Sequence, residues 1–446
     1  MELEAFIKWP GAPLTEALVL RALNRLTLHP VPVSAPSSSD KPLLQWATYD
    51  CLDHDLTLSR PSLILSSSFT IRKALIRKHF LHRCILAYTT KYPESRLLQY
   101  VPRTWDIEIS FADELDELWS DELWDLAEEL DSGSEKWWIL KPGMSDRGMG
   151  IRLFNSKDTL QRIFEEFEAT EDEDDESGNE NANDDTNVAT SQLRHFVIQE
   201  YVSNPVLLDP RQSATNPGEA LPSLRQLDEG RKFHLRAYCV ASGALSVYLY
   251  PRILALFSSE AYVQPSSAFK TLNDIDLRPH LTNTCLQGKA GETNVRLLDE
   301  LVGYRILSED DPDDRECITE HDIASITNQV ADALSETFKA ALQMPVHFQP
   351  LPNAFELYGV DLLVSHGPSD GTSGRFQVKL LEFNSEPAIE MTGARLRWIL
   401  EDLFDLIAKT CIHPFFSGGD MVVMASSNET EGGCALRQCL DVKLRG

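Results

Sequence analysis

The protein has 446 residues, with 41 lysines and arginines against 69 aspartates and glutamates, and a formal net charge of −28. This acidic balance argues against general nucleic-acid binding, which requires basic surface. No run of about eighteen apolar residues is present, so no membrane span is predicted, and the first residues lack the pattern of a secretory signal. The eight scattered cysteines indicate reduced thiols, so we expect a cytoplasmic protein of about two or three domains.

Residues 1–68 are predicted to form a small α/β domain. Apolar residues recur at helical spacing between Thr15 and Leu26. The Pro- and Ser-rich stretch 31–41 indicates a loop, and residues 63–65 indicate a strand.

The segment 70–83 is the most basic part of this acidic protein. Its apolar residues recur at helical spacing, and it carries Arg72, Lys73, Arg77 and Lys78. The cations indicate either an ordinary solvated helix face or a docking surface for an acidic partner.

Between residues 106 and 131, tryptophan and leucine recur among acidic residues at near-helical spacing. This pattern predicts an amphipathic helix over the core, with a partner-docking helix as the alternative. Composition sets the other boundaries: a central domain at 69–202 with a disordered acidic insertion at about 168–190, a C-terminal domain at 203–418 with polar insertions at about 209–230 and 299–320, and a flexible tail at 419–446. The ordered remainder alternates strands and helices, which favours an α/β or α+β fold.

The stretches 355–363 and 378–384 predict two β-strands joined as a hairpin by a turn-rich connection. Asp361 lies on the first strand, and Glu382 and Asn384 lie on the second. Because Glu382 and Asn384 are two residues apart, their side chains leave the same face. Three oxygen-bearing side chains facing one point suit Mg²⁺, whereas a solvated polar face is the alternative.

A second group of candidate residues surrounds a glycine-containing loop. A predicted strand ends at Lys141, and the loop after it carries Gly148 and Gly150 before another strand at 151–154. Glycine lets backbone N–H groups approach phosphate oxygens closely, and lysine adds a positive charge. The pattern is neither a P-loop nor a Rossmann fingerprint, so a phosphate site and a plain hairpin turn both fit it.

Residues 231–240 alternate between polar and apolar. Lys232, His234 and Arg236 share one face of the predicted strand, and apolar residues occupy the other. Three basic side chains on one face repel one another unless an anion lies over them. The sequence therefore predicts an anion-binding face on a central strand.

Two shorter segments add polar groups. The end of a predicted strand offers backbone groups that suit an adenine edge, and a polar turn after His280 offers groups that suit a γ-phosphate. The residues concerned are Gln199, Glu200, Tyr201 and Val202 in the first segment and Thr282 and Asn283 in the second.

Taken in chain order, these elements have the layout of an ATP-grasp ligase and resemble the tubulin–tyrosine ligase family, closest to its fungal branch. The resemblance covers about residues 65–415. It rests on Lys141 with Gly148 and Gly150, Val-Ile-Gln199-Glu-Tyr201, Arg-Lys232-Phe-His-Leu-Arg236, Tyr-Leu-Tyr250, His280-Leu-Thr282-Asn283, Leu-Tyr-Gly-Val-Asp361 and Leu-Glu382-Phe-Asn384-Ser-Glu-Pro-Ala. It implies a small N-terminal α/β domain followed by central and C-terminal domains that clasp ATP between them.

The resemblance also implies ATP and Mg²⁺ as cofactors and a role for each matching residue. Lys141, with the loop glycines, would hold the α- and β-phosphates; Gln199, Glu200, Tyr201, Val202 and Lys232 would frame adenine, with His234 near the ribose; Arg236, Thr282 and Asn283 would lie at the γ-phosphate; Asp361, Glu382 and Asn384 would hold Mg²⁺. Two positions depart from the family. His234 stands where the family usually has aspartate. After Tyr250, Pro251-Arg252-Ile253 replaces the family's Arg-Glu-Gly, so the candidate catalytic arginine, Arg252, lies one position later in the sequence than the family arginine.

The family's activity implies that this protein uses ATP to join a free amino acid to a protein carboxylate. The leading expectation is tyrosine added to the C-terminus of α-tubulin, whose acidic tail would dock on Arg72, Lys73, Arg77 and Lys78. One alternative is glutamate or glycine added to side-chain carboxylates. Another is a weakly active or inactive binding module in a cytoplasmic RNA-processing-body assembly.

Overall fold

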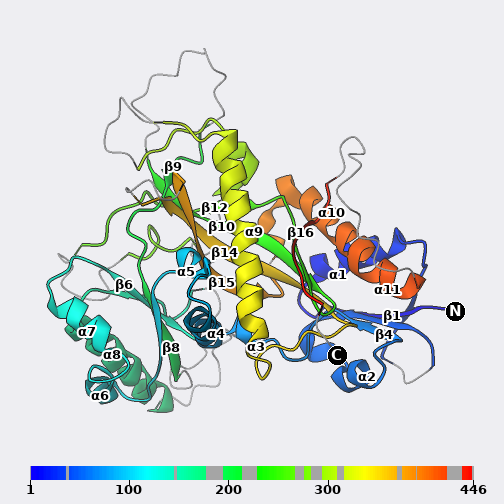
Figure 1. The fold of residues 1–446 in the computed structure, drawn as a ribbon, viewed down its shortest axis with the longest axis horizontal. Helices are drawn as coiled ribbons and strands as arrows, with labels where there is room; N and C mark the ends of the chain where they lie inside the picture. Colours follow the sequence, from blue (N-terminus) through cyan, green and yellow to red (C-terminus); the bar gives the residue numbers. More distant parts are fainter. Residues whose placement is uncertain are drawn as a thin grey trace.

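The computed structural model of the protein describes residues 2–36, 40–144, 148–176, 194–212, 229–266, 276–282, 294–308, 316–368, 374–387, 389–418 and 434–443. A long central sheet runs through the molecule, with one lobe built on β6 and β8 at one end and a second lobe built on α1, α2 and α10 at the other (Figure 1). Within the described ranges, no helix is both long and apolar enough to cross a membrane.

The N-terminal segment forms a parallel four-stranded sheet in the order β2-β1-β3-β4. Its elements are β1 (Glu4–Lys8), α1 (Pro13–Asn24), β2 (Val31–Val33), β3 (Leu43–Ala47), α2 (His54–Ser59) and β4 (Ile64–Ser66). The predicted helix and the predicted strand at 63–65 correspond to α1 and β4. The prediction of a loop throughout 31–41 is wrong at its start, because residues 31–33 pair with β1.

The central segment forms a second four-stranded sheet, antiparallel and in the order β5-β8-β6-β7. Its elements are β5 (Thr104–Glu108), α6 (Leu115–Leu118), α7 (Trp124–Asp131), β6 (Trp138–Pro142), β7 (Arg152–Phe154), α8 (Lys157–Glu176) and β8 (His195–Glu200). Helices α3 (Lys73–Ile76), α4 (Lys78–Lys91) and α5 (Leu97–Tyr100) lead into it.

The prediction of one amphipathic helix over 106–131 is wrong. Residues 104–108 form β5, which pairs with β8. Trp105, Ile107 and Ile109 alternate onto the face that meets the core of this segment, so strand periodicity prevails at the start of the segment. Only the later part is helical, as the two short helices α6 and α7.

The prediction of a disordered insertion at about 168–190 is wrong at its start, because α8 continues to Glu176. Leu160, Ile163, Phe164 and Phe167 pack the first turns of α8 into the core of the central segment. Glutamate and alanine have high helix propensity, so the helix continues beyond this apolar face. The rest of the predicted insertion, residues 177–190, lies outside the described residues.

The C-terminal segment forms an eight-stranded sheet in which β10 is central. The strand order is β13-β12-β10-β11-β16, and β14 pairs with both β10 and β15. Its strands are β9 (Leu207–Leu208), β10 (Arg231–Ser242), β11 (Ser246–Leu249), β12 (Leu254–Phe257), β13 (Val295–Leu297), β14 (Phe355–His366), β15 (Phe376–Ser385) and β16 (Arg437–Asp441). The predicted hairpin is confirmed as β14 and β15, which pair antiparallel.

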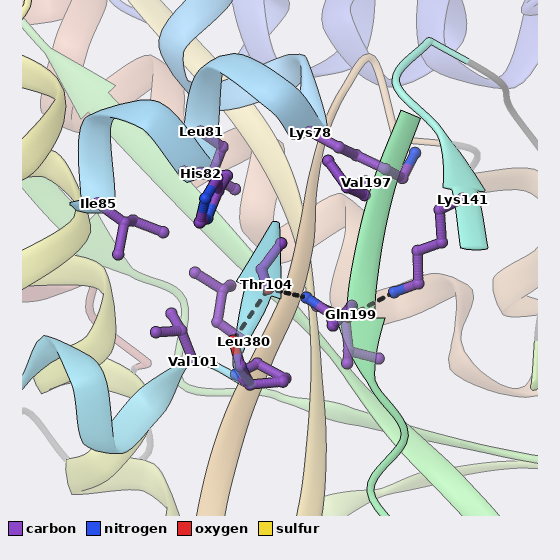
Figure 2. Close-up of a pocket in the computed structure, with 12 residues that line it drawn as sticks. Lys78, Leu81, His82, Ile85, Val101, Thr104, Lys141, Val197, Gln199 and Leu380 are labelled. Carbon is purple, nitrogen blue, oxygen red and sulfur yellow. Dashed lines mark hydrogen bonds between the residues drawn. The ribbon is translucent and has the colours of Figure 1, made fainter. Parts of the chain in front are cut away.

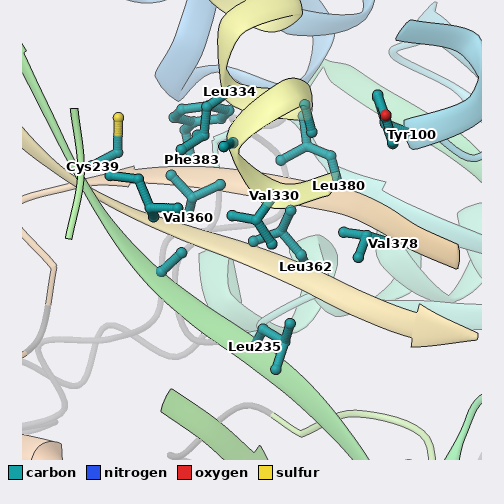
Figure 3. Packing of buried hydrophobic residues seen from close by; sticks show 14 of the residues in the cluster. Tyr100, Leu235, Cys239, Val330, Leu334, Val360, Leu362, Val378, Leu380 and Phe383 are labelled. Atoms are coloured by element: carbon teal, nitrogen blue, oxygen red, sulfur yellow. The ribbon is translucent and has the colours of Figure 1, made fainter. Parts of the chain in front are cut away.

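Two helical layers cover this sheet. On one face, α9 (Glu320–Leu342) lies across the hairpin, where Val330 and Leu334 pack in one cluster with Val360, Leu362 and Leu380 (Figure 3). On the other face, α10 (Arg397–Ile407) and α11 (His413–Ser417) share a single apolar core with the N-terminal helix α1.

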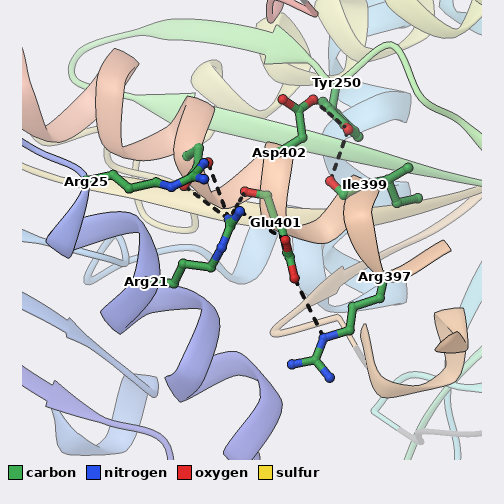
Figure 4. A network of polar contacts seen from close by, with 8 residues as sticks. Arg21, Arg25, Tyr250, Arg397, Ile399, Glu401 and Asp402 are labelled. Atoms are coloured by element: carbon green, nitrogen blue, oxygen red, sulfur yellow. Dashed lines mark hydrogen bonds and ion pairs between the residues drawn. The ribbon is translucent and has the colours of Figure 1, made fainter.

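Ion pairs reinforce the contact between α1 and α10 (Figure 4). Asp405 accepts from Arg21 at 3.3 Å and also pairs with Arg25, while Arg21 reaches Glu401 at 3.0 Å. The N-terminal unit is therefore fixed to the C-terminal segment by both apolar and charged contacts.

Three further boundary predictions are wrong in part. In the predicted insertion 209–230, Asp209 is buried and pairs with Arg211. In the predicted insertion 299–320, residues 299–308 and 316–320 are described, and Leu301, Tyr304, Ile306 and Ile318 lie in the apolar core. In the predicted flexible tail, residues 437–441 form β16 and pair with β11. Residues 213–228, 309–315, 419–433 and 444–446 lie outside the described ranges.

Candidate active site

A cavity of about 320 Å³ lies between the four-stranded sheet of the central segment and the β14–β15 hairpin of the C-terminal sheet. It collects most of the site residues predicted from sequence, although they are far apart in the chain. Those that line it are Lys141, Gln199, Glu200, Tyr201, Val202, Lys232, His234, Arg236, Thr282, Asp361, Glu382 and Asn384. Gly148 and Gly150 adopt positive φ angles of 77° and 71° after β6 but do not line it, and Asn283 lies outside the described residues.

The acidic end of the cavity is built by strand pairing. Asp361 lies opposite Glu382 in the β14–β15 ladder, next to a register shift after Asp361. Arg236 lies opposite Asp361 in the β10–β14 ladder and donates to both of its oxygens, at 2.5 and 3.0 Å. The amide of Asn384 donates to Asp361 at 3.1 Å. Two ladders therefore bring the carboxylates, the amide and a guanidinium to one place.

The two carboxylates are close to positive charges from several elements. Lys78 of α4 lies 3.1 Å from Glu382. Burial alone would raise the pKa of Glu382, but Lys78 and Lys141 outweigh it and lower this pKa to about 2. Glu382 is thus ionised at neutral pH. An ionised carboxylate beside the Asp361 carboxyl and an amide oxygen is the donor chemistry that Mg²⁺ prefers, so these residues fit the ion that the family implies.

The basic side of the cavity holds two lysines with unusual surroundings. The Lys141 ammonium donates to Gln199 at 2.7 Å, and the Lys232 ammonium donates to the Tyr201 hydroxyl at 3.4 Å. Neither forms an ion pair with a carboxylate of the described residues. Burial lowers the pKa of Lys141 to about 8, and burial together with the charge of Lys141 lowers that of Lys232 to about 7. Polyphosphate oxygens would supply the missing negative charge.

We expect ATP binding to take up protons near pH 8. In the nucleotide-free protein, Lys141 and Lys232 are partly neutral at this pH. Phosphate oxygens would raise the pKa of both lysines toward its ordinary value. Isothermal titration in buffers of different ionisation enthalpy should give roughly one proton taken up per nucleotide, and affinity should fall as pH rises from about 7 to 9.

The stability of the nucleotide-free protein should change with pH in the opposite direction to its ATP affinity. Its unfolded lysines bind protons more tightly, so these two groups increase its stability as pH rises from about 7 toward 10.5.

The control for this titration is the double variant Lys141→Met/Lys232→Met, which should bind the nucleotide weakly and without the extra proton uptake. Equal uptake by the wild type and the double variant would contradict the assignment of the protons to these lysines.

At the end of the cavity opposite the carboxylates, Gln199 of β8 forms hydrogen bonds to both neighbouring strands, β6 and β5. Gln199 accepts from Lys141 and donates to the Thr104 hydroxyl at 3.2 Å (Figure 2). The cavity also has apolar side chains in its walls: Ile139, Ile151, Leu256, Leu281 and Leu363. Apolar walls with a few fixed polar groups suit a planar base.

The polar turn after β12 closes the side of the cavity. The Tyr201 hydroxyl lies 2.9 Å from His280 Nδ1, and His234 Nδ1 lies 2.5 Å from the Thr282 hydroxyl. Burial lowers the pKa of both histidines, that of His280 to about 4. Both imidazoles are therefore neutral at physiological pH. His234 Nε2, 3.6 Å from Asp361, is buried with no hydrogen-bond partner in the described parts of the chain.

The prediction that Arg252 belongs to the catalytic group is not supported by its position. Its guanidinium lies 5.6 Å from the ring centre of Trp398 and 3.7 Å from Asp299, and it does not line the cavity. The tight turn in which Ile253 donates to the Pro251 carbonyl at 3.1 Å buries Ile253 and leaves the arginine on the side of α10.

The prediction of one exposed basic helix at 70–83 is also wrong. The chain bends at Arg77, between α3 and α4. Arg72 is buried and paired with Glu356 of β14, and Lys78 contacts Glu382 in the active-site region. Of the four candidate docking cations, only Lys73 is exposed. Local spacing indicates a solvated helix face, but Arg72 and Lys78 instead pair with carboxylates that lie far away in the sequence.

Several site residues were not identified from the sequence. Lys78 was assigned to partner docking, and Thr104 and the turn 385–387 were not assigned. The sequence contained one signal for the contact with this turn. Gly359 interrupts an apolar strand, and such glycines often permit another segment to approach the backbone closely. A Cβ at Gly359 would lie 2.6 Å from Pro387 and 3.3 Å from Arg236.

The fold and this cavity define an ATP-grasp protein, as predicted. The crystal structure of the C-terminal domain from K. lactis Pby1, an ATP-grasp enzyme interacting with the mRNA decapping enzyme Dcp2, matches with a TM-score of 0.65 and 31% identity, over 99% of this chain and 100% of that chain. The model of the Tubulin-tyrosine ligase family matches residues 60–418, and the chain belongs to this family.

Two fungal relatives extend the comparison. The chain is 39% identical over 386 residues to "Probable tubulin--tyrosine ligase PBY1" of Saccharomyces cerevisiae, which covers 84% of this chain and 46% of that protein. It is 38% identical over 393 residues to "Probable tubulin--tyrosine ligase C12B10.04" of Schizosaccharomyces pombe. This match covers 85% of this chain and 85% of that protein. The chain therefore spans less than half of the first relative and most of the second.

Proposed function

We propose that the protein is an ATP-dependent ligase that joins an amino acid to a protein carboxylate through an acyl phosphate. One observation carries the proposal. Buried Lys141 and Lys232, which form no ion pair with the described carboxylates, line the same cavity as Asp361, Glu382 and Asn384. A triphosphate with its divalent ion would satisfy both ends of this cavity at once.

In this proposal, each side of the cavity binds one part of ATP. Lys141 and Arg236 contact the phosphates, with Thr282 near the γ-phosphate. The segment 199–202 frames adenine, and Lys232 lies between adenine and the phosphates, where its ammonium group also contacts a phosphate oxygen. His234 lies near the ribose. Asp361, Glu382 and Asn384 would hold Mg²⁺, which supplies charge neutralisation on the phosphates when bound.

The reaction follows from the low reactivity of a carboxylate toward amines. An oxygen of the acceptor carboxylate attacks the γ-phosphorus, the bond from that phosphorus to the β–γ bridging oxygen breaks, and ADP leaves with the electron pair. The substrate ammonium group loses one proton, and its nitrogen attacks the acyl carbon. The C–O bond to phosphate breaks, phosphate leaves, and the nitrogen loses a second proton as the amide forms. Lys141 and Arg236 stabilise charge on the phosphoryl oxygens during transfer.

For the substrates, we propose tyrosine and the C-terminus of α-tubulin, with a cytoplasmic location. The names of the two fungal relatives support this choice. Transfer of glycine or glutamate is the alternative, since the chain is also 23% identical to "Tubulin glycylase 3B" of Drosophila melanogaster over 69% of its length.

The test is an intact-mass assay of detyrosinated tubulin incubated with the protein, ATP, Mg²⁺ and isotopically labelled tyrosine. We expect the mass of one tyrosine on α-tubulin and none when ATP is omitted. Parallel reactions with labelled glutamate and glycine test the alternative. Unlabelled tubulin, under conditions in which a known ligase labels it, would contradict the tubulin version of the proposal.

A second candidate function is a role in an mRNA-decapping assembly. The K. lactis relative interacts with the decapping enzyme Dcp2, and Arg252 does not line the cavity here. We propose that the protein binds the corresponding decapping enzyme. ATP binding without any ligated product, together with a stable complex with that enzyme, would favour this function over ligation.

A further inference from the structure

A second cavity, of about 220 Å³, lies between the N-terminal sheet and the C-terminal segment. The turn after β15 separates it from the ATP cavity, and Glu386 and Pro387 of this turn line both cavities. A small molecule bound here would therefore lie next to the acidic end of the ATP cavity. None of the site residues predicted from sequence lines this cavity except Arg72.

Aromatic side chains form much of its wall. Trp46 stacks on Phe404 with a centroid distance of 5.8 Å and meets Phe355 edge-on at 5.5 Å. Trp9 is fixed over the cavity by its indole N–H, which donates to the Trp46 carbonyl at 3.0 Å. A dry cavity of about 150 Å³ is enough to hold a benzene molecule. The space here is larger, so it has room for an aromatic side chain.

The charges around the cavity select a cationic group. Its lining contains one arginine, Arg72, against three glutamates, Glu356, Glu386 and Glu390. Arg72 is already paired with buried Glu356, whereas Glu386 and Glu390 are exposed at the rim. An acidic peptide tail would be repelled here, and an ammonium group would be attracted.

Glu386 is held in an unusual backbone conformation. Its φ is 56°, in the left-handed region that favours glycine. Its carboxylate accepts a hydrogen bond from the Tyr49 backbone N–H at 2.9 Å, which directs it toward the N-terminal sheet. Strain of this kind at a non-glycine residue is frequent at ligand sites.

We infer that this cavity binds the amino acid substrate, and that this substrate is an α-amino acid with an aromatic side chain. The aromatic ring lies among Trp9, Trp46 and Phe404, and the ammonium group faces Glu386 at the boundary with the ATP cavity. The inference rests on the proposed ligase function, and it assigns the amino acid site to residues that include the segment before the family match at residue 60.

The test is direct binding of free amino acids to the full protein saturated with Mg²⁺ and a non-hydrolysable ATP analogue. Saturation-transfer NMR and titration should detect L-tyrosine and L-phenylalanine, but neither L-glutamate nor glycine. Glu386→Gln should weaken tyrosine binding about tenfold or more, the cost of a lost charge-assisted contact. Trp9→Ala provides a second variant, because Trp9 is half-buried and its loss spares the core residue Trp46.

Glu401→Gln is the matched control. Glu401 is a partly exposed, ion-paired glutamate on α10 that does not line the cavity, and its substitution should leave tyrosine affinity unchanged. Tyrosine binding that resists both Glu386→Gln and Trp9→Ala would overturn the inference. Binding of glutamate, glycine or an acidic tail peptide that depends on Glu386 would overturn it as well. Failure of the ligase proposal is distinguishable, since the wild-type protein with ATP and Mg²⁺ would then form no ligated product with any amino acid, whether or not it binds tyrosine.

Discussion

Replacing Asp361 with asparagine should reduce acceptor-dependent ATP turnover by about 10²- to 10³-fold or more. Asp361 is a candidate Mg²⁺ ligand, and it fixes Arg236 through two hydrogen bonds, at 2.5 and 3.0 Å. Loss of its charge would weaken metal binding and release the guanidinium that we place at the γ-phosphate. The measurement is phosphate release and labelled product under single-turnover conditions.

The same substitution should also destabilise the protein, because Arg236 is then buried without a full counter-charge. Removing one partner of a buried ion pair costs about 3–5 kcal/mol, so turnover must be measured at a temperature at which the variant remains folded. The control is Asp405→Asn, which removes another mostly buried carboxylate. Asp405 is paired with Arg21 and Arg25 and does not line the ATP cavity. It should lose stability but retain turnover in the folded fraction. Equal turnover in the two variants would contradict the role of Asp361.

Replacing Lys141 with methionine should weaken ATP binding about 10- to 100-fold, which corresponds to the loss of one charge-assisted hydrogen bond. Lys232→Met should have a similar effect. Both variants should be more stable than the wild type in the absence of nucleotide, by on the order of 1–3 kcal/mol. Each removes a buried cation that pays a desolvation cost and forms no ion pair with a described carboxylate. Calorimetric titration and thermal unfolding with and without ATP measure the two effects separately.

The control for these variants is Lys379→Met. Lys379 is a half-buried lysine of β15 that donates to the Gln99 carbonyl at 2.7 Å, and burial lowers its pKa as well. Because it does not line the ATP cavity, its replacement should leave ATP affinity unchanged. A Lys141→Met variant that binds ATP as tightly as the wild type would remove the main support for the proposed function.

Local patterns predicted the strands that carry the site. The alternation in 231–240 identified β10 and the face shared by Lys232, His234 and Arg236, and the two apolar runs identified the hairpin with Asp361. These signals depend on neighbours along the chain, and strand period alone determines them. The family resemblance then supplied the order of the motifs, and the family match over residues 60–418 confirms the resemblance.

Contacts between distant segments were not predicted. The pairing of Arg72 with Glu356 joins residues 284 positions apart, and nothing in the spacing of the basic segment indicates that a carboxylate lies opposite it. The strand β16 was assigned to a flexible tail, because a short polar segment acquires its structure only from the free edge of β11. The second cavity was missed for the same reason, since its walls come from both ends of the chain.

The apolar core shared by α1 and α10 makes the family-matched segment depend on residues that precede it. Leu18 and Val19 of the N-terminal helix belong to the same cluster as Leu400, Leu403 and Phe404. A fragment trimmed to the family-matched segment 60–418 would present this apolar surface to water and tend to aggregate. Any gene rearrangement that transfers the ATP-grasp region to a new protein would therefore need to carry the first sixty or so codons with it.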